Sequence, residues 1–399
     1  MIFHDIFLII TQKIVPLLYA IIGFGGLIAI HEGGHLLFCK LFGIYAPTFS
    51  IGFGPELFRK QIGSTNFRLA LIPLGGYVEM AGNAEFGQGE QKHAAMVGDS
   101  SYESKPYWQK LLVSLGGIIF NLLFAYLVFC GLFLSGSSNK QAVMVVDIVK
   151  ESAAAKAGLK AGDAILSIQA ARLNEGEEVA STPQELALAP GENLIPDAQQ
   201  KLLAVIQANP NSNILITLER SNQEIVLPVT LGSKSMGERT IGSLGANFLF
   251  PLPKLPLFQA IKAGFDYTNQ NILLIIDSIK RLFCQRSLDG AGGPLMIISM
   301  SASSAQHGVI PLLIFLALLS INLALINLLP IGALDGGQLF FISIEALLRR
   351  KLPQALKNTI DIGSWVLFLG LFAFLTYRDI VHLFGTKLSW VYHFVLSFF

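Results

Sequence analysis

The sequence predicts a polytopic α-helical membrane protein with one soluble domain inserted between its spans, and three observations carry this prediction. Only 14% of the 399 residues are charged and 52% are hydrophobic, whereas about 25% of an ordinary soluble domain is charged. The mean hydropathy is +0.57. Four apolar segments approach the length of about 20 residues that a bilayer requires, and the chain turns polar between the second and the third.

The four apolar segments define the expected transmembrane helices. They run over about Ile14–Cys39, Leu111–Leu134, Val309–Leu329 and Ile362–Leu375. The fourth is short because Arg378 and Asp379 interrupt its apolar run. The first is too long for the apolar region of a cleaved signal peptide, and it contains the ionisable residues His31, Glu32 and His35.

Composition and charge exclude several other classes of protein. The 28 basic and 27 acidic residues give a net charge of +1, so there is no basic excess for binding nucleic acid. A disordered chain would be far more polar. The three cysteines, Cys39, Cys130 and Cys284, are widely separated and form neither a disulfide framework nor a C-x-x-C metal pair.

The distribution of lysine and arginine predicts the orientation. Seven basic residues lie between residues 40 and 110, and four more lie between 349 and 357. Loops rich in Lys and Arg remain in the cytoplasm. We therefore expect both of these loops to be cytoplasmic, and both termini and the 135–308 segment to be outside.

The polar segment 140–235 reads as a soluble, strand-rich domain. Strands are expected at 143–149, 164–168, 214–220 and 224–229, the last two forming a hairpin around 221–223, with a short helix over 152–158 and a loop over 172–197. A second β pattern covers 46–82, beside the first span. Residues 256–283 have the apolar periodicity of an amphipathic helix.

The first span contains the motif His31-Glu32-Gly33-Gly34-His35. Histidines four residues apart project from one face of a helix, so both imidazoles can reach one metal ion. The intervening Glu32 can then take a proton from a water molecule at the metal. Ionisable groups within a membrane are costly unless they have partners, which makes this cluster a functional candidate.

A zinc site needs a third protein ligand, and Asp335 is the preferred candidate. It follows the third span in Asn327-Leu328-Leu329-Pro330-Ile331-Gly332-Ala333-Leu334-Asp335-Gly336-Gly337, where proline and glycine end the helix. The third span returns to the cytoplasmic end, near which His31 lies. Asp289, in a second Leu-Asp-Gly triplet, precedes that span on the opposite side and is read as a surface turn.

Two other interpretations remain open at this stage. The cluster of His31, Glu32 and Asp335 could be a proton or cation relay of a transporter or channel, although no inverted repeat is evident. A different membrane zincin would use a glutamate as third ligand, but Glu345 lies beyond Asp335 on the basic loop side.

Several motifs together resemble the site-2 protease family of intramembrane zinc metalloproteases, and most closely the subgroup of the bacterial regulator of sigma-E protease. They are H-E-G-G-H at 31–35, the N-x-x-P…LDGG segment at 327–337, G-F-G-P at 52–55, G-G-Y-V-E-M at 75–80, S-K-P-Y-W at 104–108 and G-G-P at 292–294. The stretch A-G-L-K-A-G-D at 157–163 is similar to the signature of a circularly permuted PDZ domain.

The resemblance implies a complete assignment. The fold would comprise four transmembrane helices, a membrane-associated β-hairpin at 46–82 and one inserted PDZ-like domain at 140–235, with spans one and two in 1–134, a connecting segment at 256–308 and spans three and four in 309–399. His31, His35 and Asp335 would bind Zn²⁺, Glu32 would be the general base, and Asn327 would contact the substrate backbone.

The resemblance also implies the setting of the reaction. The substrates would be single-span proteins of the bacterial inner membrane, such as an anti-sigma factor or a remnant signal peptide. Asn121 matches a family position where a substrate role and an interhelical hydrogen bond are equally open. Gly332 departs from the family, since many members have proline there.

Overall fold

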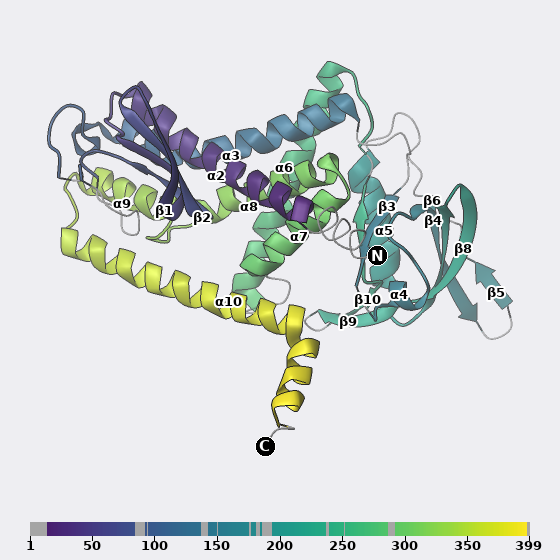
Figure 1. Cartoon of the computed structure of the whole chain (residues 1–399). Helices are drawn as coiled ribbons and strands as arrows, with labels where there is room; N and C mark the ends of the chain where they lie inside the picture. Colours follow the sequence, from purple (N-terminus) through teal and green to yellow (C-terminus); the bar gives the residue numbers. More distant parts are fainter. Residues whose placement is uncertain are drawn as a thin grey trace. The chain divides into compact units, whose positions relative to one another are not determined.

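The computed structural model divides the chain into two compact units, which are considered separately. The first comprises Met1–Tyr126 and Asn271–Phe399, and the second comprises Leu127–Gln270 (Figure 1). The structure describes residues 14–83, 92–93, 95–136, 143–149, 151–174, 177–180, 184–185, 194–236, 239–250, 252–285 and 292–396.

Four described helices are long and apolar enough to cross a membrane. They are α2 (Val15–Leu41), α3 (Tyr107–Ser135), α8 (Val309–Asn327) and the Gln354–Val381 part of α10 (Gln354–Leu396). None of the residues in the most apolar stretch of α10 is buried within the protein. An apolar face of this extent is stable only against another apolar phase, such as lipid.

The fourth span differs from the expected Ile362–Leu375, because α10 continues through Arg378 and Asp379. Asp379 is buried and accepts hydrogen bonds from the backbone N–H groups of Gly293 (3.0 Å) and Met296 (2.9 Å). These groups belong to the first turn of α7 (Pro294–Gln306), a helix that the sequence pattern did not predict. A carboxylate that caps a helix N-terminus is stabilised there, so it need not end the helix that carries it.

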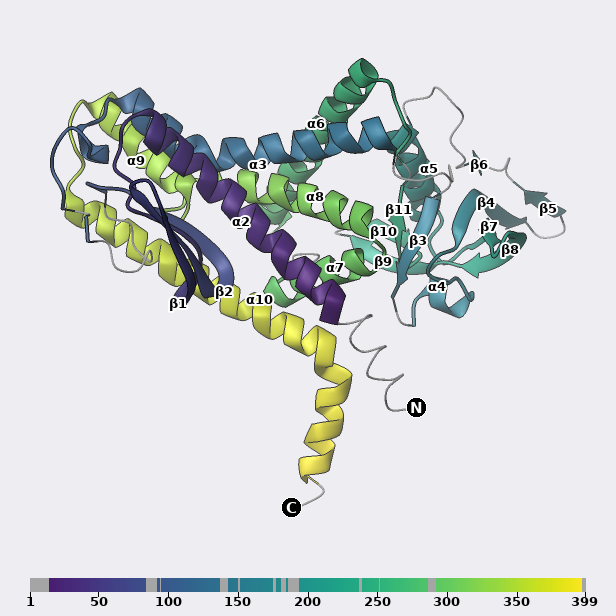
Figure 2. The same cartoon turned by 45° about the horizontal axis from the view of Figure 1, so that its top comes forward.

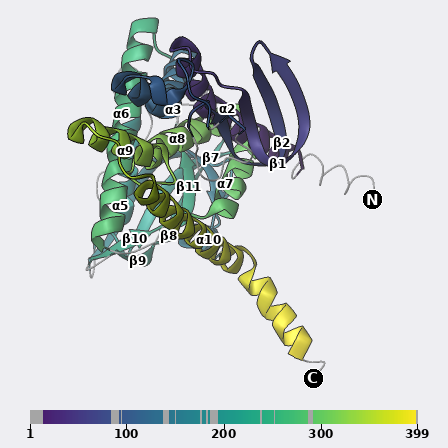
Figure 3. The same cartoon turned by 90° about the vertical axis from the view of Figure 1, so that its left-hand side faces the viewer.

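The β pattern of 46–82 forms a long hairpin of β1 (Thr48–Ile62) and β2 (Thr65–Glu79) beside α2 (Figures 1 and 2). Figure 3 shows the hairpin standing on one side of α2. Residues 48–51 pair on one side with 66–69 and on the other with 76–79, so the hairpin curls into a small sheet. Among the described residues, 76–79 have no strand partner on their other side.

A hydrophobic cluster fixes the base of the hairpin against the helices. Its buried members come from the end of α2, both strands, the start of α3 and α9 (Asp335–Leu348), and they are Cys39, Ile44, Ala46, Phe49, Val78, Met80, Tyr102, Val113 and Ile342. The short 3-10 helix η2 (Tyr102–Ser104) contributes Tyr102. The hairpin is thereby held next to the helix that carries the two histidines.

The second unit contains a sheet in the order β11-β3-β4-β7-β8, with β5 and β6 also paired to β4. The bounds are β3 (Val143–Ile148), β4 (Ala164–Asn174), β5 (Glu177–Ala180), β6 (Gln184–Glu185), β7 (Asn213–Arg220), β8 (Gln223–Thr230), β9 (Gly232–Met236), β10 (Arg239–Ser243) and β11 (Ala246–Leu249). Helices α4 (Ala153–Lys156) and α5 (Leu194–Ala208) also belong to this unit, and α6 (Leu257–Gln285) belongs to it as far as Gln270. The β7–β8 turn is Ser221-Asn222, with both residues at positive φ, the conformation of a type I′ hairpin.

Two features of this unit differ from the sequence analysis. The 172–197 segment was expected to be a loop, but its described parts include the end of β4, strands β5 and β6 and the start of α5. The helix α5 was not expected. It packs Leu202, Val205 and Ile206 into the core, and this tertiary burial stabilises a helix that its sequence indicated only weakly.

The A-G-L-K-A-G-D stretch forms a tight turn that is tied to the end of β7. Gly158 and Gly162 have φ of +80° and +92°, which glycine adopts without strain. Asp163 is buried and accepts two hydrogen bonds of 2.7 Å from Arg220, which also donates to the carbonyl of Gly158. Burial alone would raise the pKa of Asp163, but the hydrogen bonds from Arg220 and from the backbone N–H of Lys160 together lower that pKa.

Candidate metal centre

Helix α2 presents His31 and His35 on the same face, one turn apart. Their Nε2 atoms lie 3.4 Å from each other. His35 is buried and His31 is half-buried. The spacing of the two histidines in the sequence therefore produces the convergence that the helical repeat predicts.

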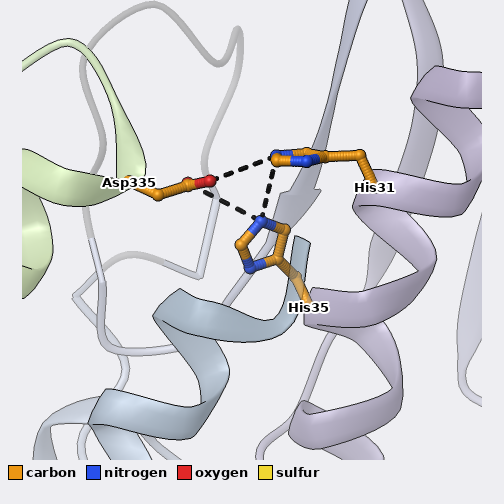
Figure 4. Close-up of side chains that lie close together, drawn as sticks. All are labelled: His31, His35 and Asp335. Carbon is orange, nitrogen blue, oxygen red and sulfur yellow. Dashed lines mark hydrogen bonds and ion pairs between the residues drawn. The ribbon is translucent and has the colours of Figure 1, made fainter. Parts of the chain in front are cut away.

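Asp335 approaches these histidines from the other side (Figure 4). Helix α8 ends at Asn327, an irregular segment follows over 328–334, and Asp335 is the first residue of α9. Its Oδ2 lies 3.1 Å from Nε2 of His31, and its Oδ1 lies 3.6 Å from Nε2 of His35. The three ligand atoms lie within 4.8 Å of one another.

These separations fit a tetrahedral metal ion. Bonds of about 2.0–2.1 Å to nitrogen and oxygen place neighbouring ligand atoms of a tetrahedron about 3.3–3.4 Å apart. The two Nε2 atoms are separated by 3.4 Å, and each of them has one carboxylate oxygen of Asp335 nearby, Oδ2 at 3.1 Å from His31 and Oδ1 at 3.6 Å from His35. Two imidazoles and one carboxylate also form the type of donor set, three protein ligands with a free fourth position, that catalytic zinc sites use.

Hydrogen bonds behind the imidazoles orient their lone pairs toward the centre. Nδ1 of His35 lies 2.7 Å from the carbonyl oxygen of Val113. It therefore carries the proton and donates to that oxygen, and Nε2 is left as the ligand.

His31 is oriented by Asn121 of α3. Its Nδ1 lies 3.1 Å from the side-chain amide of Asn121, which is fully buried. The Oδ1 atom of Asn121 otherwise has no partner among the described residues. Because amide oxygen and nitrogen are interchangeable by rotation, the rotamer that accepts from the Nδ1–H of His31 satisfies both groups. The side chain of Asn121 thus orients the imidazole of His31. The backbone oxygen of Asn121 also accepts a hydrogen bond from the hydroxyl of Ser320.

Glycines allow α2 and α3 to cross closely at the centre. A Cβ on Gly34 would lie 2.1 Å from the carbonyl oxygen of Gly116, so no larger residue fits between the two backbones. A Cβ on Gly117 would lie 2.4 Å from Cε1 of His31 and 2.5 Å from Nε2 of His35. A Cβ on Gly33, by contrast, would meet no atom within 4 Å, so this position of the motif has room for a larger side chain.

A cavity opens beside the three ligand atoms and is lined by residues from five parts of the first unit, namely α2, the hairpin segment, α3, the 327–338 segment and α10. It contains His31, Glu32, His35, Phe53, Gly76, Val78, Met80, Ser114, Asn327, Gly332, Ala333, Leu334, Asp335, Gln338, Asp361 and Trp365. Gly76 and Val78 of β2 contribute to its lining, and a Cβ on Gly76 would lie 2.9 Å from Cγ of Glu32. The strand therefore lies directly against the helix that carries the motif.

The structure brings together all of the residues that the sequence analysis assigned to the site. His31, His35 and Asp335 converge, while Glu32 and Asn327 line the same cavity. Asp289 lies outside the described residues. Glu345 is engaged elsewhere, because it accepts from Lys357 at 2.7 Å and from the backbone N–H of Leu352 at 2.9 Å.

Four polar or aromatic lining residues were missed, namely Ser114, Gln338, Asp361 and Trp365. Gln338 follows Asp335 by three residues, so the helical repeat of α9 could have suggested it. Asp361 and Trp365 lie four residues apart on α10. The signal for them in the sequence was the position of Asp361, an ionisable residue, next to an apolar run.

Comparison with known proteins identifies the family. The model of peptidase family M50 matches residues 19–371. The chain belongs to this family. It is a metalloprotease with similarity over most of its length to relatives from distant organisms.

Three of these relatives illustrate the range of the M50 family. A Clostridium perfringens protein named as a zinc metalloprotease is 30% identical over 369 residues, covering 92% of this chain and 98% of its own. A Helicobacter pylori protein with the same type of name is 32% identical, covering 87% and 95%. The chloroplast membrane metalloprotease ARASP of Arabidopsis thaliana is 32% identical, covering 87% of this chain and 75% of its own.

Proposed function

We propose that this M50 protein is an intramembrane zinc metalloprotease that hydrolyses peptide bonds within the transmembrane segments of single-span proteins in the bacterial inner membrane. The convergence of His31, His35 and Asp335 beside Glu32, on helices apolar enough to span a bilayer, is the observation that carries the proposal. Anti-sigma factors and remnant signal peptides are the substrate types that we expect.

His31, His35 and Asp335 would hold the metal, and the donor set and the spacing of its atoms both suit zinc. When bound, zinc polarises a carbonyl group and lowers the pKa of water to about 7. Asn121 and the carbonyl of Val113 keep the two imidazoles in the tautomer with Nε2 directed at the metal.

Glu32 would move the protons of the reaction. It lies in the same turn of α2 as the two histidines and lines the cavity. We propose that its carboxylate takes a proton from the attacking water and later delivers it to the nitrogen of the leaving amine. One group can serve both steps because the proton that it accepts in the first is the one that it donates in the second.

The substrate must become extended before it can be cut, since a helix buries its carbonyl groups in i→i−4 hydrogen bonds. The unpaired side of residues 76–79 could hold an extended segment by strand addition. Asn327 lines the cavity, and its Nδ2 lies 3.3 Å from Nε2 of His31. Its amide would hold the unwound substrate backbone near the metal.

The decisive experiment is cleavage of a tagged single-span reporter by purified protein in lipid vesicles, with Glu32→Gln as the variant. The glutamine retains the shape and the three ligands, so zinc should remain bound while cleavage falls by at least about 100-fold. Gly33→Ala, in the open position of the same motif, is the matched control and should cut at the normal rate. Normal turnover by Glu32→Gln would refute the mechanism.

The alternative, a transporter or channel relay, is not favoured by the geometry. A relay needs groups spaced along a path, whereas these three ligand atoms surround one point. Metal content separates the two readings, because a relay has no need of stoichiometric zinc.

We further propose that the strand-rich second unit is a PDZ-like domain on the outer side, which excludes substrates with bulky outer domains. The A-G-L-K-A-G-D turn and the buried Asp163–Arg220 pair are the features that support this assignment. Replacing 140–249, which includes the strands β10 and β11 that pair with β9 and β3, by a short flexible linker should then permit cleavage of a large-ectodomain substrate and change cleavage of a short one little. Equal slowing of both substrates would indicate a structural role.

A further inference from the structure

A carboxylate with no role in the proposed metal centre lines the cavity. Asp361 lies near the start of α10 and reaches the cavity together with Trp365, one turn later on the same face. It is not part of the group of ligand atoms formed by the two histidines and Asp335. The cavity lining also includes the polar Gln338 of α9, whereas the residues that line it from the hairpin segment, Phe53, Val78 and Met80, are apolar.

The approach of Asp361 to the site depends on Gly332. A Cβ on residue 332 would lie 2.6 Å from Oδ1 and 3.2 Å from Cα of Asp361, and 2.7 Å from Oγ of Ser364. Any larger residue would therefore displace α10 or turn the carboxylate away. Glycine at 332 and aspartate at 361 are thus spatially complementary in this chain.

Asp361 has one carboxylate oxygen without a hydrogen-bond donor, and Lys357 acts on it only through a Coulomb interaction. Its Oδ1 is shielded from solvent and has no hydrogen-bond donor within the described part of the chain. Lys357, four residues earlier on the same helix, is at the usual spacing for an ion pair. The ammonium of Lys357 is instead 2.7 Å from Oε1 of Glu345. A buried carboxylate oxygen without a donor is costly in a membrane segment, which makes Oδ1 of Asp361 available to a donor that is present only during function.

We infer that Asp361 is a specificity-determining residue that accepts a hydrogen bond from a donor side chain of the substrate, an amide or ammonium of Asn, Gln or Lys, close to the scissile bond. This inference rests on the proposed protease function. The cavity joins Asp361 to the metal-binding residues, so a substrate chain bound at the metal would have side chains within reach of both walls. An apolar side chain suits the hairpin wall, and a donor suits the wall of α10.

The test uses paired reporters that are identical except at one position. Each of the three residues on either side of the cleavage site is made Leu in one reporter and Gln in its pair, and the ratio of the two kcat/KM values is measured. A hydrogen bond to a charged acceptor predicts that, at one position at least, wild-type protein prefers Gln by about tenfold or more. Asp361→Leu should bring that ratio to about 1 or below, and Asp361→Asn should reduce it.

The matched control is Asn358→Leu, an exposed polar residue of the same helix that does not line the cavity. It should preserve the ratio. A ratio unchanged in Asp361→Leu, or equal slowing of both reporters with the ratio preserved, would overturn the inference. So would a wild-type enzyme that cuts all pairs at equal rates. If wild-type protein with bound zinc cuts no reporter, the proposed function itself fails, which is a different result.

Discussion

The substitution Gly117→Ala tests the geometry of the metal centre without removing a ligand. The added methyl group would lie 2.4 Å from Cε1 and 2.6 Å from Nε2 of His31, and 2.5 Å from Nε2 of His35. Carbon atoms in ordinary contact are about 3.5 Å apart, so each imidazole, or the whole of α3, must move by roughly 1 Å. Metal sites tolerate displacements of only about 0.2 Å in their bonds.

We therefore expect Gly117→Ala to fold and to lose most of its zinc affinity and activity. A displacement of about 1 Å at a reacting centre can reduce the rate about 100-fold. The assay is zinc content of the purified protein, by elemental analysis, together with reporter cleavage. The Gly33→Ala variant is the control, because the same methyl group meets no atom within 4 Å there. Zinc content and turnover within threefold of wild type in Gly117→Ala would show that the imidazoles are not held where the structure places them.

Three further predictions concern other parts of the molecule. Asn121→Leu should weaken zinc binding about 10- to 100-fold, because it removes the acceptor for the Nδ1–H of His31. Competition with a chelator measures the affinity, and an unchanged affinity would contradict the role of Asn121. Asp335→Ala should lose zinc whereas Asp289→Ala should retain it; the reverse result would exchange their assignments. Arg220→Ala should destabilise the second unit by about 3 kcal/mol, because it leaves the carboxylate of Asp163 buried without its cation. Hydrogen exchange of the full chain should show the largest difference near neutral pH. The difference should shrink as pH falls, first because protonation of Asp163 relieves the buried charge in the variant, and then because wild type loses its own ion pair as pH falls through the lowered pKa of Asp163. A difference that is independent of pH would exclude the charge as its cause.

The sequence was sufficient for the parts of the fold and site that depend on local spacing. Two histidines at i and i+4 must share a helix face, and they converge to 3.4 Å. Asp335 was chosen by the depth at which its span ends, and the structure places it against the same histidines. Both arguments use only the helical repeat and the length of a span.

The remainder depended on contacts between distant segments. Asp379 was read as the end of a span, but its partners are the N–H groups of Gly293 and Met296, over 80 residues earlier. Asn121 stayed undecided because an amide on an apolar helix gives no sign of which residue it faces. Asp361 belongs to no motif, and its place in the cavity lining and the close approach of Gly332 are visible only in the structure.

The metal centre depends more on the close approach of helix backbones than on the packing of large side chains. Helices in lipid gain little from burying apolar side chains, so close packing of small residues holds them together. Here the same small residues also determine the chemistry. Gly34 lets α2 contact α3 at Gly116, which brings Asn121 to His31, and a Cβ on Gly337 of α9 would lie 2.4 Å from the carbonyl oxygen of Ile331. Since α9 begins at Asp335, any separation of these backbones moves a metal ligand or its support. How well the protein tolerates alanine in place of each glycine should therefore depend on the space around the position that a Cβ would occupy. It should depend less on the distance along the chain from the H-E-x-x-H motif.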